Sequence, residues 1–103
     1  MAFTTVQYIR QVAVAVVTAT TTQYTVPASR QDVLKCVTVS NTTAASVTFT
    51  MTCAAINLFT AVSVPANQTL TWTGTLVLNA AETITTAASA VGLNLLVSGL
   101  ESQ

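Results

Sequence analysis

Charged side chains are scarce in this chain, since only 6% of its 103 residues are Asp, Glu, Lys or Arg, against about a quarter in an ordinary soluble domain. Three cations and three carboxylates give a formal net charge of zero. Proteins that bind nucleic acid or an anionic membrane through charge need a basic patch, so we expect neither partner. A surface so poor in charge is also weakly protected against self-association, and we expect copies of the chain or another protein to cover much of it.

Histidine is absent, and there are only two cysteines and three glycines. The chain therefore lacks the residues needed for a conventional zinc site, for a nucleophile activated by histidine, and for a glycine-rich phosphate loop. Of the three carboxylates, Asp32 is expected to form a solvated ion pair beside Arg30 and Lys35, Glu82 to be an edge charge at a turn, and Glu101 to lie in a C-terminal tail. We expect no catalytic residue, no cofactor and no metal, and hence no enzyme.

Long apolar runs are also missing. The run at residues 12–17 has six residues, which is too short for a signal-peptide core or a membrane span. Its alternation of valine with alanine favours a strand, and no apolar stripe of helical period lasts two turns. Synthesis in a reducing cytosol is expected, because free thiols are the favoured state of the two cysteines.

Threonine, which favours strands, is present in place of charge, with 21 copies. Apolar and polar residues alternate with a period of two between turn signals. The sequence therefore predicts an all-β fold, a small antiparallel β-sandwich of jelly-roll or immunoglobulin-like type with about seven to nine short strands. Residues 1–22 are expected to be an N-terminal strand or arm that reaches another subunit, and residues 23–103 to be the sandwich domain.

The clearest alternation lies in residues 32–53, which we expect to form a β-hairpin that turns at residues 41–45. Pairing of its arms would place Cys36 opposite Met51 and Leu34 opposite Cys53 on one buried face. The two thiols would then be diagonal neighbours, which favours free buried cysteines over a disulfide. Further along, residues 54–59 lack a clear period and suggest a loop or one helical turn. Gly74 is expected to end one strand and Gly99 another.

Two short strings recur in the sequence. Val-Pro-Ala occurs at residues 26–28 and 64–66, and Thr-Thr-Ala-Ala-Ser occurs at residues 42–46 and 85–89. If they mark a duplication, each half of the chain forms one sheet of the sandwich.

Aromatic and threonine side chains supply the candidate binding residues. Trp72 alternates in phase with Leu70 and is expected in the core, although a lone tryptophan on a sandwich can also stack on a sugar. This leaves a carbohydrate- or cell-surface-binding module as an alternative function. Tyrosine is enriched at interfaces. The candidate interface residues are Tyr8, Arg10, Tyr24, Thr48, Thr50 and Thr52.

A series of segments, at residues 24–28, 34–42, 64–68, 76–84 and 97–101, is similar to small structural proteins of tailed bacteriophages. The similarity covers about three-quarters of the chain. It consists of short segments typical of a β-sandwich, not of a catalytic motif. It implies a component of the virion, serving as capsid decoration or cement, or as a neck or tail accessory. It also implies that the partners are further copies of the chain and other virion proteins, such as capsid, neck or tail proteins.

Overall fold

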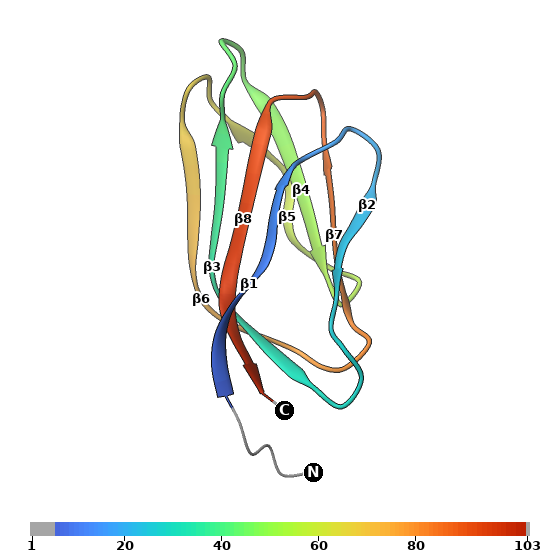
Figure 1. Ribbon diagram of the computed structural model, residues 1–103. Coiled ribbons are helices and arrows are strands. Elements are labelled where there is room, and N and C mark those ends of the chain that lie inside the picture. Colours follow the sequence, from blue (N-terminus) through green and yellow to red (C-terminus); the bar gives the residue numbers. More distant parts are fainter. Residues whose placement is uncertain (1–5, 103) are drawn as a thin grey trace.

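The computed structural model describes residues 6–102, which form two antiparallel four-stranded sheets packed face to face (Figure 1). One sheet has the order β1-β8-β3-β6 and is called sheet A, and the other has the order β2-β7-β4-β5 and is called sheet B. The strands are β1 (Val6–Ala15), β2 (Thr21–Thr25), β3 (Gln31–Asn41), β4 (Val47–Cys53), β5 (Ile56–Val64), β6 (Thr69–Leu78), β7 (Thr83–Ala88) and β8 (Leu93–Ser102).

The strand pairs are those of one long hairpin that has been rolled up. β1 pairs with β8, β2 with β7, β3 with β6 and β4 with β5, and the roll is closed where β3 meets β8 and β4 meets β7. This is the eight-stranded jelly roll, in which two Greek keys form a double sheet. The predicted all-β antiparallel sandwich is confirmed.

The core lies between the inner faces of the two sheets. β4 alternates strictly, with Phe49 and Met51 fully buried. On the opposite sheet, Leu34, Val37 and Val39 of β3 are equally buried. Because successive side chains of a strand point to opposite faces, this alternation covers each sheet on one side with apolar groups and leaves threonine on the other.

The expected hairpin at residues 32–53 is wrong. Its two arms are β3 and β4, which lie in different sheets and face each other across the core. Residues 42–46 carry the chain from one sheet to the other, and the buried Asn41 holds this connection by donating from Nδ2 to the carbonyl oxygens of Ala45 (2.8 Å) and Val64 (2.9 Å). Alternation specified which side chains point inward, but not which strand pairs with which.

The segment expected to be a loop or helical turn is instead a tight hairpin that leads into β5. Cys53 pairs with Ile56, so Ala54 and Ala55 form a two-residue turn, with φ of 52° and 64°. Two positive φ values are the mark of the type I′ turn, whose twist matches that of the flanking strands. Alanine gives no sequence signal for such a turn, since asparagine and glycine are its usual residues.

The two strand ends predicted at glycines are also wrong. β6 runs through Gly74, and β8 runs through Gly99 to Ser102, so the expected tail is part of sheet A. The segment expected to be an arm contributes β1, which pairs with β8 and supplies Val12 to the core; its first five residues lie outside the described part.

The duplication hypothesis fails at the level of the sheets, because each sheet takes strands from both halves of the chain. The repeated Val-Pro-Ala nevertheless marks two equivalent turns. The Arg30 N–H donates to the Pro27 carbonyl and the Gln68 N–H donates to the Pro65 carbonyl, with a positive φ at the third residue of each turn. That pattern is typical of a type II turn. The Thr-Thr-Ala-Ala-Ser strings are not equivalent, since one is a connection and the other lies mostly in β7.

Candidate functional site

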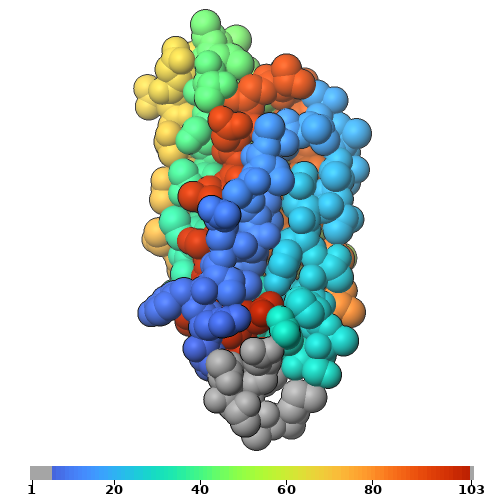
Figure 2. Space-filling view, in the orientation of Figure 1, coloured from blue at the N-terminus to red at the C-terminus, as the bar shows by residue number. Residues whose placement is uncertain are grey.

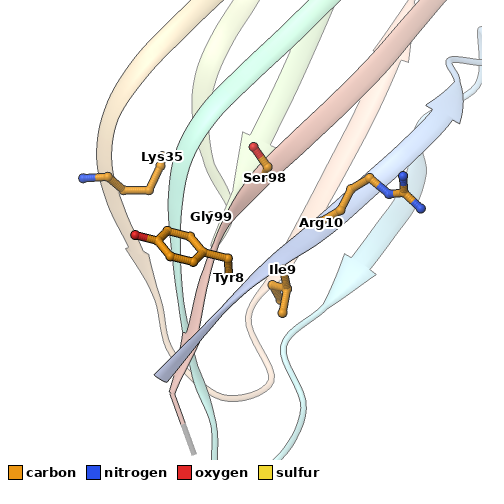
Figure 3. A pocket seen from close by; sticks show the side chains of 6 residues that line it. All are labelled: Tyr8, Ile9, Arg10, Lys35, Ser98 and Gly99. Atoms are coloured by element: carbon orange, nitrogen blue, oxygen red, sulfur yellow. The ribbon is translucent and has the colours of Figure 1, made fainter. Parts of the chain in front are cut away.

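A hollow opens on the outer face of sheet A where two strands carry β-bulges. The register of β1 against β8 shifts between Arg10 and Val12, and that of β3 against β8 shifts between Leu34 and Cys36. Both bulges lie beside the same part of β8, and bulges bend a strand locally and occur often next to functional sites. The hollow has a volume of about 500 Å³ and is lined by Tyr8, Ile9, Arg10, Lys35, Ser98 and Gly99 (Figure 3).

Two cations and one aromatic ring give the hollow its chemical character. Tyr8 is 87% exposed. In Figure 3 its ring and the Lys35 side chain extend in the same direction, whereas Arg10 extends the opposite way. The Lys35 Nζ donates to Thr75 Oγ1 at 2.9 Å, and among residues 6–102 the single ion pair is that of Arg30 with Glu101. The hollow is therefore positively charged without a carboxylate of its own.

An apolar row crosses the full width of the sheet next to the hollow. Tyr8 is in register with Leu100, Leu100 with Val33, and Val33 with Val77, so the row spans all four strands. All four side chains are half-buried or exposed, since each alternates with a residue that faces inward. We call Tyr8, Leu100, Val33 and Val77 the outer row. Figure 2 shows β1, which carries Tyr8, at the surface beside β8 on one side and β2 on the other.

Directly behind the outer row, two carboxylates are buried inside the sandwich. Asp32 and Glu101 are paired residues of β3 and β8, exposed by 0% and 5%. The Tyr24 hydroxyl of β2 reaches both, at 2.6 Å from Asp32 Oδ2 and 3.1 Å from Glu101 Oε2. Arg30 donates to Glu101 Oε1 at 2.9 Å. We call Asp32, Glu101, Tyr24 and Arg30 the carboxyl cluster.

The polar groups of this cluster are not fully satisfied. Asp32 Oδ1 and both polar atoms of the Gln11 side chain are buried and have no hydrogen-bond partner of good geometry among residues 6–102. Burial raises the pKa of Asp32, the nearby Glu101 raises it further, and the Tyr24 hydroxyl and Gln11 amide oppose the rise. Burial, followed by the two carboxylates, raises the pKa of Tyr24 well above its ordinary value, which keeps its hydroxyl protonated.

The expectations for two carboxylates were therefore wrong. Asp32 is not a solvated partner of Arg30 or Lys35, and Glu101 does not lie in a tail. The alternation along each strand already indicated that both carboxylates are buried. Asp32 has the same phase as the buried Leu34, and Glu101 has the same phase as the buried Val97. Glu82 does lie at a turn, where its side chain accepts a hydrogen bond from the Asn79 N–H at 2.6 Å.

The sequence-predicted interface residues fall into three places. Tyr8 and Arg10 both line the hollow, and the half-buried Tyr24 belongs to the carboxyl cluster. Thr48, Thr50 and Thr52 lie half-buried on the outer face of sheet B. There the Ala61 N–H donates to Thr50 Oγ1 at 3.0 Å, and Thr52 Oγ1 donates to Asn57 Oδ1 at 2.9 Å, so these hydroxyls bond to β5 where its pairing with β4 is irregular.

Trp72 and Cys53 pack against the interior, and Cys36 lies nearer the surface. Trp72 is half-buried and packs against the core, as its phase with Leu70 predicted. Cys53 is a buried free thiol, whereas the free Cys36 is only half-buried, because the bulge after Leu34 turns it outward. The two cysteines lie in different sheets, so the pairing that suggested diagonal neighbours does not exist. Burial raises the pKa of Cys53 to about 11.

No three His, Cys, Asp or Glu side chains gather in a possible metal-binding group within the described part of the chain. Residues 6–102 also include no helix long and apolar enough to cross a membrane. Comparison of the sequence with protein-family models and with curated proteins gave no match.

Proposed function

We propose that this protein is a non-enzymatic structural subunit that assembles with further copies of itself through the outer face of sheet A, as a decoration, neck or tail accessory component of a phage virion. The observation that carries the assembly is the outer row. It places four apolar side chains in register across four strands, with Tyr8 and Val77 the most exposed. Contiguous exposed apolar residues of this kind are typical of protein contacts.

The outer row is complementary to itself. A two-fold axis parallel to the strands, between β8 and β3, would reverse the order of the row in the second copy. The projecting Tyr8 ring of one copy would then lie over the short Val77 of the other, and Leu100 over Val33. Such an isologous contact buries the same patch on both copies, as two sheets packed face to face do.

The charges of the face agree with this arrangement. Under the same axis, Arg10 would face Thr73 of the second copy, and the region of Lys35 would face Ser98, so that no two cations are opposed. Like charges in contact would weaken the contact. Since the rest of sheet A is mainly threonine, serine and alanine on this side, few charges need to be desolvated on assembly.

The virion setting rests on the resemblance to small phage structural proteins. The jelly roll is compatible with it, because this topology recurs among viral capsid domains, although it also recurs among lectins. Mass spectrometry of purified particles of the phage that encodes the chain should detect it in stoichiometric amounts. Particles that lack it would contradict the virion setting without affecting the proposed self-association.

The test of assembly is the molar mass of the protein by light scattering or sedimentation equilibrium, for the wild type and Tyr8→Lys. We expect the wild type to self-associate and Tyr8→Lys to be monomeric. Ile56→Lys is the matched control, because Ile56 is 72% exposed but lies on β5 of the other sheet. A monomeric wild type, or equal loss of association in both variants, would overturn the proposal.

A sugar-binding role is the second candidate, and the specific observation in its favour is the exposed Tyr8 in a hollow with Arg10, Lys35 and Ser98. Trp72 is a poorer stacking platform, since it packs against the core. Val77→Lys separates the two roles, because Val77 belongs to the outer row but does not line the hollow. Val77→Lys should abolish self-association and spare sugar binding.

A further inference from the structure

The Tyr24 hydroxyl touches more carboxylate oxygens than its single proton can serve. Its oxygen lies 2.6 Å from Asp32 Oδ2 and 3.1 Å from Glu101 Oε2, both within hydrogen-bonding distance. A phenol has one O–H to donate, but its oxygen can also accept. Both contacts are therefore full hydrogen bonds only if one of the two carboxyl groups is itself protonated and donates to Tyr24.

The positions of the other charges decide which carboxyl group carries the proton. Glu101 accepts from the Arg30 guanidinium at 2.9 Å, and a cation at this distance favours the ionised form of a carboxylate. Asp32 is completely buried and forms no ion pair with any cation in the described part of the chain. Besides Glu101 from β8, the groups that face it are the Tyr24 hydroxyl from β2 and the Gln11 amide from β1, neither of which carries charge.

A second observation, independent of Tyr24, also points to a neutral Asp32. Its buried Oδ1 has no hydrogen-bond partner of good geometry among residues 6–102. The Gln11 side chain of β1, which is 7% exposed, lies near enough to lower the pKa of this carboxyl, but neither of its polar atoms makes a hydrogen bond of good geometry. An unpartnered oxygen of an ionised carboxylate is far more costly to bury than the carbonyl oxygen of a neutral acid. The unpaired Oδ1 is therefore easier to explain if Asp32 holds a proton.

We propose that the carboxyl cluster is a proton-binding site, in which Asp32 retains a proton at neutral pH and donates it through Oδ2 to Tyr24, while Tyr24 donates to the ionised Glu101. Arg30 then balances the one remaining negative charge. Release of the proton would leave two buried carboxylates on paired residues of β3 and β8, against a single cation, and would weaken this end of sheet A.

The site acts on the outer row through the strands that the two share. Asp32 and Val33 are adjacent on β3, as are Leu100 and Glu101 on β8, so each buried carboxyl lies directly behind one apolar member of the row. The proton site does not depend on the proposed assembly, because it is defined by contacts inside one chain. Its tests accordingly measure protonation and stability, and not association.

Infrared spectroscopy tests the proton directly. A neutral carboxylic acid has a carbonyl band that ionised carboxylates lack, and at neutral pH an exposed carboxylate is ionised. We expect the wild type to show this band at neutral pH, Asp32→Asn to lose it, and Glu82→Gln, a matched removal of a carboxylate at a turn, to retain it. Absence of the band from the wild type, or its survival in Asp32→Asn, would overturn the proposal.

Stability as a function of pH gives the second readout, which needs only the wild type if Asp32→Asn fails to fold. A raised pKa means that the folded state binds the proton more tightly than the unfolded chain does. The resulting stability is full below the ordinary pKa of aspartate and is lost as the pH rises through the folded-state pKa of Asp32. The denaturation midpoint should fall over the same pH range in which the infrared band disappears. A wild-type midpoint that stays constant or rises while the band disappears would contradict the proposal.

Discussion

Gly99 of β8 packs against the Val33 carbonyl of β3 so closely that a Cβ atom at position 99 would overlap the carbonyl oxygen. The bulge after Leu34, which is paired with Gly99, lies at the same level of the sheet. A glycine inside a strand often marks such an approach. Neither atom can retreat without breaking the β3–β8 ladder that closes sheet A.

Gly99→Ala should therefore lower the free energy of unfolding by about 3 kcal/mol or more, since overlap with backbone is not relieved by a side-chain rotation. Urea denaturation measures the change. Gly74→Ala is the matched control in β6, where a Cβ would meet only the Trp72 ring, at 3.0 Å. We expect that variant to lose about 1 kcal/mol or less; equal losses in the two variants would contradict the backbone explanation.

Asn41→Ala should destabilise the protein by about 2–4 kcal/mol, because four hydrogen bonds of a buried side chain are lost together. Besides its two donated bonds, Asn41 accepts at Oδ1 from the Thr43 N–H (2.9 Å) and hydroxyl (2.7 Å). The control is Asn57→Ala, an exposed asparagine whose side chain bonds, among the described residues, only to the surface hydroxyls of Thr52 and Thr60. Thermal denaturation of that variant should differ little from the wild type, and a similar loss at both positions would speak against the role of Asn41.

Substitutions in the Ala54–Ala55 turn should increase the stability of the protein. Alanine in the left-handed region is strained by roughly 1 kcal/mol per residue, and asparagine followed by glycine suits the type I′ geometry. The double variant Ala54→Asn, Ala55→Gly should gain about 1 kcal/mol, which corresponds to roughly 4–8 °C in Tm. Ala44→Gly, in the connection between β3 and β4, should give no gain, because Ala44 does not have a positive φ.

The two thiols should react at very different rates in the folded protein. At about pH 8 a thiol with a pKa near 11 is almost entirely protonated and therefore a weak nucleophile. Cys53 is also buried, whereas Cys36 is half-buried. Alkylation should show one fast thiol, which Cys36→Ser removes, and one slow thiol that reacts on unfolding. Fast labelling of Cys36→Ser would contradict the buried state of Cys53.

Alternation was sufficient to predict the class of fold and much of the core, but not the strand pairing. The inward phase of residues such as Phe49, Met51 and Leu34 is the same in a hairpin and in a sandwich whose sheets face each other. Pairing depends on where the connection leads, and residues 42–46 cross between the sheets because Asn41 ties them to Val64, far away in the sequence. No local pattern reveals that bond.

The site was predictable only in part. Tyr8 and Arg10 were candidates because of their residue types. The hollow that they line lies at two β-bulges, and nothing in the sequence identifies the extra residue of either bulge. The outer row needs the register of four strands that are distant in the chain. The buried carboxyls were missed because Asp32 was judged by its charged neighbours in sequence, although its strand phase already pointed inward.

The rolled topology determines how late in synthesis sheet A can be completed. In its own sheet β1 has β8 as its sole neighbour among the described strands, and β8 is the last of these strands to be translated. Until the ribosome has released β8, sheet A lacks the strand that joins β1 to β3, and β1 presents two unpaired edges. Contacts between such distant segments form slowly, and nascent chains with open edges are prone to pair with one another. Sheet A should thus be completed only after β8 has left the ribosome, and until then the scarcity of charge gives the open edges little protection against association.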